Sequence, residues 1–374
     1  MDNVINDIDA TEEVDRKELA TVVIIKELNP IPNKDRIELV VFEDFGYTCI
    51  AEKGIHKIGD NAIFIREGSI VPDIEIFDWM ANFKFRVKPK SFTIRDDEDF
   101  VVDKIYSQGI LMPFYIIEQH FEKEANKKYE GTTTYCHIDL FWEQGKDVTD
   151  ILGIKKYIPP PQKGEGMGNM LQKGDFPTHL VSKTDEDRLA NKMRSLEELD
   201  GLEVIARVKM EGSSITLYKE DGELEVCSRN TILKEVEGNK FWIAANRYNL
   251  KETMPEDIII QGELMGPGIQ KNKLGLTEVD FYVFNVYDKN TRELWSDGSV
   301  IAICEELGLK ICPEVCWWEK FVLEFDTLQK LADTLKYENG VDAEGMVIRP
   351  VHHFISKVWR KNWSAKVLNR NYVF

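Results

Sequence analysis

The stretch that decides the fold is Arg207–Ser214, which reads R-V-K-M-E-G-S-S. Apolar and polar residues alternate over Glu203–Val208, as they do in a half-buried strand. A second strand is predicted over Ser214–Tyr218, and the turn sequence E-D-G then leads into a third. Lys209 therefore lies at the end of a strand, beside a turn that Gly212 can relax.

A lysine held at a strand end is either a nucleophile or an ordinary surface residue. An amine attacks phosphorus or carbonyl carbon only when it is neutral, so a nucleophilic Lys209 needs neighbours that lower its pKa, such as other cations or a metal ion. The sequence K-x-E-G is common by chance, so this stretch alone favours the surface residue. The rest of the chain has to decide between the two interpretations.

Length and composition limit the possible classes of protein. A chain of 374 residues is long enough for two domains, each with its own core. It has no apolar run of membrane-spanning length and no signal-peptide pattern at its start. The 6 cysteines match neither a disulfide framework nor a zinc-ligand spacing, which favours a reducing, intracellular and cytoplasmic location. We expect a monomer that does not bind membranes.

Charge is distributed unevenly along the chain. The net charge of −18 argues against indiscriminate coating of nucleic acid, and residues 1–18 form an acidic tail that we expect to be disordered. Residues 345–374, by contrast, contain no Asp or Glu. They contain the cations Arg349, Lys357, Arg360, Lys361, Lys366 and Arg370. This predicts a local positive surface for a phosphate-bearing ligand, with charge balance across a domain face as the alternative.

The first half of the chain is rich in short strands. They are predicted over Leu19–Leu28, where Pro30 stops the strand, and over Arg36–Phe42, Tyr47–Ala51 and Ala62–Arg66. Several short strands at close spacing are typical of a small barrel or sandwich. The segment Phe83–Arg95 is predicted as a further strand, with basic residues on one face and apolar residues on the other. The basic residues are Lys84, Arg86, Lys88 and Lys90. Such a strand suits an OB fold that binds nucleic-acid backbone, and a solvated face explains it equally well.

Composition divides the chain into four parts. They are the acidic tail at 1–18, an OB-like domain with appended elements at 19–155, a Pro/Gly-rich linker at 156–190 and a second domain at 191–374. Helices are predicted at Asp147–Leu152, after a cap at Thr184–Glu186, and at Ser299–Leu307 and Thr327–Tyr337, the last two closed by Gly308 and Gly340. Strands and helices interspersed in this way predict the α+β class.

Three carboxylates share one sequence context. Glu211, Glu263 and Glu344 each lie at a predicted strand end beside a glycine, as Lys209 also lies at a strand end. Mg²⁺ binds oxygen ligands of this kind and usually keeps several waters and substrate phosphates. Each glutamate taken alone is better explained as a surface residue, so the repeated context is the argument for a site.

At these residues the chain resembles the covalent nucleotidyltransferase superfamily, which comprises polynucleotide ligases and mRNA-capping guanylyltransferases. The matching segments are Lys209–Gly212 (motif I), Ser228–Asn230 (Ia), Gly262–Leu264 (III), Phe281–Val286 (IIIa), Glu344–Arg349 (IV) and Ser364–Leu368 (V). All occur in the family's order over roughly the last half of the chain. Several short motifs in register are far more specific than any one of them.

Within the superfamily the chain is most similar to ATP-dependent RNA ligases. The run G-E-L-M-G-P-G-I-Q-K-N followed by D-F-Y-V-F-N resembles phage enzymes that seal nicks in duplex RNA. The first half resembles the OB domain that precedes the adenylyltransferase domain in a separate RNA ligase group, on N-P-I-P-N-K-D-R-I-E-L, Y-S-Q-G-I-L-M-P and K-T-D-E-D-R. The resemblance implies an N-terminal OB-like β-barrel followed by an antiparallel-sheet nucleotidyltransferase (ligase adenylation) domain.

The resemblance also implies a reaction and roles for residues. The enzyme would join 3′-OH and 5′-phosphate RNA ends, such as those of a nicked duplex, in RNA repair. It would do so through lysyl-AMP and then an RNA-adenylate. Lys209 would be the nucleophile, Arg229 would contact ribose or phosphate, Phe284 would stack on adenine and Lys366 would neutralise the α-phosphate. Glu211, Glu263 and Glu344 would hold hydrated Mg²⁺ or Mn²⁺, the first through water.

One motif departs from the family pattern, and other functions remain as alternatives. Motif V is typically K-x-K, and its second lysine is Leu368 here, so that either one lysine suffices or Arg370 or Lys361 substitutes. A capping guanylyltransferase would use GTP, and a DNA ligase would act on DNA ends. A non-catalytic RNA-binding protein derived from a ligase is the alternative of another class. The intact Lys209, Glu263 and Glu344 speak against it.

Overall fold

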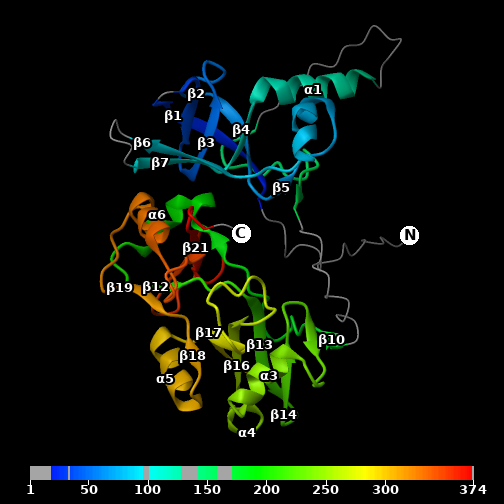
Figure 1. Cartoon of the computed structure of the whole chain (residues 1–374), viewed down its shortest axis with the longest axis vertical. Coiled ribbons are helices and arrows are strands. Elements are labelled where there is room, and N and C mark those ends of the chain that lie inside the picture. Colours follow the sequence, from blue (N-terminus) through cyan, green and yellow to red (C-terminus); the bar gives the residue numbers. More distant parts are fainter. Residues whose placement is uncertain (1–17, 33, 96–100, 128–141, 158–170, 373–374) are drawn as a thin grey trace, which may run out of the picture. The chain divides into compact units, whose positions relative to one another are not determined.

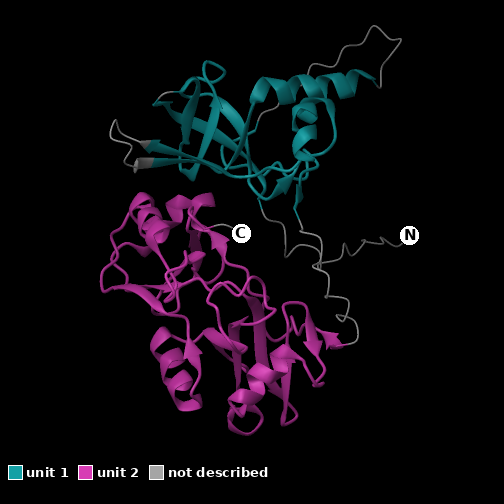
Figure 2. Ribbon diagram, viewed as in Figure 1, with its two compact units in different colours: residues 1–159 teal, residues 160–374 magenta. Residues whose placement is uncertain are grey.

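The computed structural model describes residues 18–32, 34–95, 101–127, 142–157 and 171–372. The chain divides into two compact units, residues 1–159 and 160–374, which Figure 2 distinguishes by colour. Both units combine strands with helices, which confirms the α+β class. The predicted acidic tail before Glu18 and residues 158–170 of the predicted linker lie outside the described residues.

A five-stranded sheet forms the core of the first unit (Figure 1). Its strands in spatial order are β3 (Phe45–Glu52), β2 (Lys34–Phe42), β1 (Ala20–Ile31), β4 (Asn61–Arg66) and β8 (Gly109–Pro113). All neighbouring pairs are antiparallel. The sheet closes on itself, because the Gln108 amide donates to the Thr48 carbonyl at 2.9 Å and Cys49 Sγ donates to the Gly109 carbonyl at 3.3 Å. A closed sheet of this kind is the OB-like barrel that the sequence predicts.

Further elements cover the outside of the barrel. They are β5 (Ser69–Ile70), η2 (Glu75–Phe83), β6 (Lys90–Arg95), β7 (Val101–Ser107), α1 (Phe114–Lys127) and β9 (Lys155–Lys156). Strand β4 is buried on both faces. Ile63 packs in one cluster with Phe77 of η2 and Ile117 of α1, whereas Phe64 contacts the Tyr47 ring at a centroid distance of 5.2 Å. The alternation of a strand therefore joins the barrel interior to an outer helical layer.

The basic strand predicted over Phe83–Arg95 is wrong in its first half. Helix η2 extends to Phe83, and the next two residues, Lys84 and Phe85, have φ angles of 53° and 57°. Their amides donate to the Ala81 and Met80 carbonyls at 2.9 and 3.1 Å, which satisfies the free carbonyls at the end of the helix. Two successive left-handed residues break the two-residue alternation, so the basic side chains of this segment do not share one strand face.

Two smaller predictions for the first unit also differ from the structure. Strand β1 continues through Pro30, because β4 pairs with β1 only as far as Ile24 and leaves an open edge beyond it, where a missing N–H costs no ladder bond. The segment Asp147–Leu152 forms turns and no helix. Thr149 Oγ1 in this segment accepts hydrogen bonds from the amides of Leu19 and Ala20. The segment is therefore fixed to the start of β1.

Two sheets form the second unit. The larger, in spatial order, contains β10 (Gln172–Asp175), β15 (Thr231–Leu233), β14 (Glu223–Cys227), β13 (Ser213–Glu220), β16 (Ile258–Met265), β17 (Asp280–Asp288) and β18 (Lys310–Ile311). The smaller contains β11 (Asp187–Arg188), β21 (Ala365–Leu368), β20 (Gly345–Pro350), β12 (Val204–Val208) and β19 (Glu314–Trp318). Only the end pairs β17–β18 and β11–β21 are parallel among the described strands. The predicted antiparallel-sheet domain is thus confirmed.

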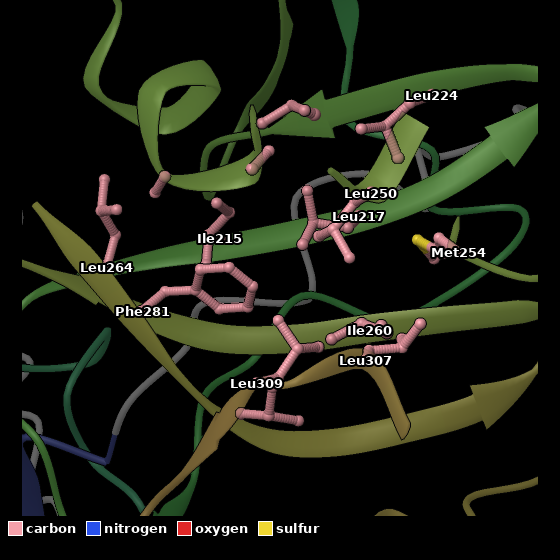
Figure 3. Packing of buried hydrophobic residues seen from close by; sticks show 14 of the residues in the cluster. Ile215, Leu217, Leu224, Leu250, Met254, Ile260, Leu264, Phe281, Leu307 and Leu309 are labelled. Atoms are coloured by element: carbon pink, nitrogen blue, oxygen red, sulfur yellow. The ribbon is translucent and has the colours of Figure 1, made fainter. Parts of the chain in front are cut away.

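One face of the larger sheet carries the core of this unit. In the part of the unit that the structure describes, the helices with printed bounds are η3 (Leu189–Asn191), η4 (Met193–Leu199), α3 (Lys240–Arg247), α4 (Leu250–Thr253), α5 (Asp297–Leu307) and α6 (Phe325–Thr334). Residues of α3, α4 and α5 belong to the same buried cluster as Ile215, Leu217 and Ile260 of the sheet (Figure 3). Strand alternation then turns Ser214 and Glu263 to the opposite face. The polar face of this sheet is where the candidate site lies.

Two helix ends in the second unit were predicted incorrectly. Thr184–Glu186 does not cap a helix, because it runs as an irregular segment into β11, which pairs with β21. The 3-10 helix η3 follows only at Leu189, and its N-cap is Arg188, which makes no side-chain capping bond. Gly308 does close α5, with a φ of 67°, whereas α6 is capped at Leu335, well before Gly340.

Candidate active site

Lys209 lies where the chain passes from one sheet to the other. Strand β12 of the smaller sheet ends at Val208, and β13 of the larger sheet begins at Ser213 (Figure 1). The Lys209 amide donates to the Gly345 carbonyl at 2.9 Å, and Tyr337 Oη donates to the Lys209 carbonyl at 3.1 Å. The backbone of the lysine is therefore fixed on both sides, which gives its side chain a defined origin.

The physical reason for a glycine at position 212 differs from the one that the sequence suggests. Its backbone is not in the left-handed region, so the turn does not require the freedom of a glycine. A Cβ atom at this position would instead lie 2.2 Å from the Leu264 carbonyl oxygen. The glycine is needed because β13 and β16 approach each other closely beside Lys209.

The Lys209 amine is held by a carboxylate. Its Nζ donates to Glu344 Oε2 at 2.7 Å, and the two side chains are 24% and 12% exposed. Burial acts to lower the pKa of Lys209, but Glu344 and Glu263 outweigh it and raise that pKa above its ordinary value. The expectation of a lowered pKa is therefore not met by the protein's own residues, and the amine needs a further positive charge nearby to become neutral at physiological pH.

The pKa of the Glu263 carboxyl is also shifted by its buried position. Burial raises the pKa of its carboxyl to about 7, although Lys209 acts in the other direction. The carboxyl also accepts a hydrogen bond from the Gly212 amide. Two carboxylates, Glu263 and Glu344, therefore converge on one lysine in a buried place where each charge affects the others.

A cavity of about 500 Å³ opens beside Lys209. The predicted residues Lys209, Arg229, Glu263, Phe284 and Lys366 all line it. They come from the loop after β12, the loop after β14, and the strands β16, β17 and β21. The structure thus brings together side chains that are more than 150 residues apart in the sequence. Glu344 does not line the cavity and reaches it through its hydrogen bond to Lys209.

Glu211 is the predicted site residue that the structure places elsewhere. It does not line the cavity. It interacts instead with Tyr372, whose pKa is raised by burial first and then by the hydrogen bond and charge of Glu211. Burial and then the Glu344 charge raise the pKa of the nearby Tyr337, with a smaller contribution from the Glu211 charge. Among the described residues, no group of three or more His, Cys, Asp or Glu side chains is arranged to hold a metal ion by itself.

The two candidates for the missing motif V lysine are both engaged outside this cavity. Arg370 binds Asp333 through Nε at 2.9 Å and Nη2 at 2.6 Å. Lys361 pairs with Asp187 at 2.7 Å. Neither residue lines the cavity beside Lys209. Of the last cationic stretch, only Arg349 and Lys366 do.

The cavity residues that the sequence did not single out as site residues include Arg349, Arg207 and Asp185. Arg349 donates to the Phe284 carbonyl at 2.9 Å and to Asn285 Oδ1 at 2.6 Å, and so ties β20 to β17. Arg207 forms a bidentate pair with Asp297, at 2.8 and 2.7 Å. Asp185 enters the cavity from the segment before β11. Arg349 lies within a motif segment identified from the sequence, and Arg207 lies within the Arg207–Ser214 stretch, so their charge could have indicated a role in the site. Asp185 was assigned to a helix cap instead.

Comparison with known proteins agrees with this arrangement. Residues 202–367 match a family model described as RNA ligase, and residues 19–114 match one described as an OB-fold domain. The second unit, which contains the matched residues, belongs to the RNA ligase family. No curated protein matches it. The two matched regions of this RNA ligase fall within the two compact units, in the order that the sequence predicts.

Solved structures of a Naegleria gruberi RNA ligase are similar to this RNA ligase over nearly its whole length. A lysine-to-alanine mutant with ATP and Mn is 26% identical, covers 94% of this chain and 96% of its own, and has a TM-score of 0.70. A lysine-to-methionine mutant with AMP and Mn is 25% identical over 94% and 97%, with a TM-score of 0.72. The enzyme with PPi is 27% identical over 94% and 97%, with a TM-score of 0.71.

In the described part of this RNA ligase, no helix has the length and apolar composition to cross a membrane.

Proposed function

We propose that this RNA ligase uses ATP to join a 3′-hydroxyl RNA end to a 5′-phosphate RNA end, through AMP carried on Lys209, in RNA repair. The observation that carries the proposal is the Lys209 amine, fixed by its backbone and by Glu344 beside a cavity large enough for a mononucleotide. The similar structures that contain ATP or AMP with Mn support the same nucleotide here.

Each lining residue suits one part of the nucleotide. Phe284 and Val347 present apolar surface to the cavity, which suits an adenine ring. Arg229 and Lys366 supply positive charge for ribose and phosphate oxygens. Cations and an aromatic surface around one amine match a nucleotide better than an uncharged ligand.

Glu263 and Glu344 fit a divalent cation. They are oxygen donors that converge on the same lysine, and their combined charge raises the pKa of its amine. Glu211, outside the cavity lining, would reach such an ion only through water. Since two carboxylates do not complete the coordination of Mg²⁺ or Mn²⁺, waters and phosphate oxygens of the nucleotide would supply the rest. When bound there, the cation lowers the pKa of the Lys209 amine and stabilises negative charge at the α-phosphate.

Three transfers then follow. The neutral amine of Lys209 attacks the α-phosphorus of ATP, the bond to pyrophosphate breaks, and AMP stays on the lysine as the amine loses its proton. The 5′-phosphate of RNA next takes the AMP, which frees Lys209 and leaves a phosphoanhydride. An RNA 3′-hydroxyl finally attacks that 5′-phosphorus, AMP departs and the phosphodiester is complete. The side chains act by positioning and charge neutralisation, as is general for phosphoryl transfer.

Label transfer tests this function. The protein is incubated with Mn²⁺ or Mg²⁺ and either ATP or GTP labelled at the α-phosphate, and is then separated under denaturing conditions. We expect label from ATP and none from GTP, and no label on Lys209→Ala. Lys330→Ala, which alters an exposed lysine of α6 outside the cavity lining, is the matched control and keeps the label. Label from GTP would instead indicate a capping enzyme.

The joining step needs its own assay. Nicked duplex RNA with a 3′-OH and a 5′-phosphate is expected to be sealed, whereas the same nick with a 5′-hydroxyl is not. Sealing of DNA nicks but not RNA nicks would contradict the proposal. A protein that binds RNA but never becomes labelled, even after pyrophosphate treatment to remove any AMP already attached, would be a non-catalytic relative.

A further inference from the structure

Asp185 lies in the nucleotide cavity between two cations. Its Oδ2 is 3.4 Å from Arg229 Nη2, and its Oδ1 is 3.6 Å from Lys366 Nζ. The charge of Asp185 also reaches the buried Lys209 amine. The Asp185 carboxylate therefore interacts with all three cationic side chains to which the proposed function gives a role at the nucleotide.

The backbone around Asp185 is fixed on both sides. Thr184 Oγ1 is hydrogen bonded to Ser214 Oγ of β13 at 2.8 Å, and the Thr184 carbonyl accepts from Arg229 Nη1 at 3.2 Å. On the other side, Asp187 of β11 pairs with Ala365 of β21, in the strand that also contains Lys366. These contacts fix the backbone on both sides of Asp185, whose side chain lines the cavity and is 23% exposed.

The Asp185 contacts are of a kind that a phosphate can replace. Carboxylates and phosphates bind guanidinium and ammonium groups through the same charge-assisted hydrogen bonds, which are about 2.7–2.9 Å long when well formed. The Asp185 pairs are longer, and the Arg229 side chain is 40% exposed. These contacts hold Arg229 and Lys366 at the cavity without forming short charge-assisted hydrogen bonds. A phosphate can therefore form stronger bonds to the same two cations.

We propose that Asp185 is an internal counterion of the nucleotide site, which holds Arg229 and Lys366 toward the cavity and yields both cations to the phosphate when ATP binds. This inference rests on the proposed function. It makes Asp185 a positioning residue that lowers the affinity for phosphate-bearing ligands. It also re-forms its pairs when AMP departs after sealing.

The test measures binding without reaction. The full-length protein is titrated with α,β-methylene ATP in the presence of Mn²⁺, because that analogue cannot transfer AMP. We expect Asp185→Asn, which keeps the shape and removes the charge, to lower the Kd about fivefold, the factor expected for two partly exposed ion pairs. Adenosine, which lacks phosphate, is expected to bind wild type and variant equally. Asp185→Ser serves as a second variant, and both are compared with wild type in melting temperature.

Asp187→Asn is the matched control. It removes the same charge two residues away, but Asp187 pairs with Lys361, which does not line this cavity. We expect its Kd for the analogue to remain within about twofold of wild type, since a removed surface charge has a small screened effect. Weaker or unchanged binding by folded Asp185 variants would overturn the counterion role, as would equal tightening in Asp187→Asn. If the wild type binds neither the analogue nor ATP, the nucleotide site itself is refuted, and that outcome is distinct from the others.

Discussion

Removal of Asp297 is expected to destabilise the second unit strongly. Arg207 donates Nε and Nη2 to the two Asp297 oxygens at 2.8 and 2.7 Å and Nη1 to the Cys312 carbonyl at 2.9 Å. The two side chains are only 9% and 12% exposed. Asp297→Ala therefore leaves a buried guanidinium with one neutral acceptor, which costs about 3–5 kcal/mol. The first turn of α5 also loses its carboxylate, which adds about 0.3–1 kcal/mol.

The magnitude follows from the unpaired charge, so removal of both charges should restore stability. Arg207→Met combined with Asp297→Ala is expected to regain most of the loss, because paired apolar substitution of a buried ion pair is often close to neutral. The matched control is Asp342→Ala. Its partner Lys336 lies at 2.7 Å, but that pair is 56% and 37% exposed and is expected to contribute less than about 1 kcal/mol.

Urea unfolding of wild type, the two single variants and the double variant measures this directly. Circular dichroism and tryptophan fluorescence follow the transition, and the fluorescence is weighted toward the second unit, which contains all the tryptophans except Trp79 and Trp142. A loss below about 1 kcal/mol for Asp297→Ala would refute the reasoning, as would a double variant no more stable than the single one. Because Arg207 is two residues before Lys209 in the same chain segment, the single variant is also expected to be labelled more slowly by ATP.

Four further results are expected. Burial lowers the pKa of His56, so the unfolded state takes up a proton at a higher pH than the folded state does. Urea unfolding should therefore show the first unit losing stability as pH falls below about 6.5, and the pH profile of His56→Gln should be flatter. Gly345→Ala should lower the melting temperature sharply, because its Cβ would lie 2.2 Å from a carbonyl oxygen at a φ of 144°, whereas Gly308→Ala meets nothing within 4 Å and should cost only about 1–2 kcal/mol. Phe284→Ala should raise the KM for ATP about tenfold in label transfer, with a smaller effect in Phe284→Tyr, since a stacking contact contributes about 0.5–1.5 kcal/mol beyond area burial. EDTA should abolish label transfer, and added Mn²⁺ or Mg²⁺ should restore it; labelling in the presence of excess EDTA would contradict the metal site.

Local patterns were sufficient for much of the fold. Ser213–Glu220 forms the first strand of the predicted hairpin, and Asp221 and Gly222 adopt the positive φ angles of its turn. This hairpin was predictable because the strand alternation and the turn residues are contained in a few neighbouring positions. The position of Lys209 at a strand end followed from the same alternation. The motifs that it shares with the RNA ligase family then indicated which distant strands would meet it.

The failures at Asp185 and Glu211 depend on contacts that a local pattern does not contain, whereas the failure at Lys84 is a local one. Lys84 was assigned to a strand face, and its left-handed backbone comes from the preceding helix end. Asp185 has the sequence of a helix cap, but the pairing of β11 with β21 carries it into the cavity. Glu211 lies in an irregular loop, where no periodicity predicts the direction of its side chain. Its neighbour Tyr372 is more than 150 residues away.

The central claim is that the Lys209 amine carries AMP, and peptide mapping tests it most directly. The full-length protein is incubated with ATP and Mn²⁺, digested, and analysed by tandem mass spectrometry for peptides that have gained one AMP. The account predicts a single modified position, Lys209, with loss of the adduct on addition of pyrophosphate. An adduct on another lysine, such as Lys366, or an adduct that persists in Lys209→Ala would contradict it.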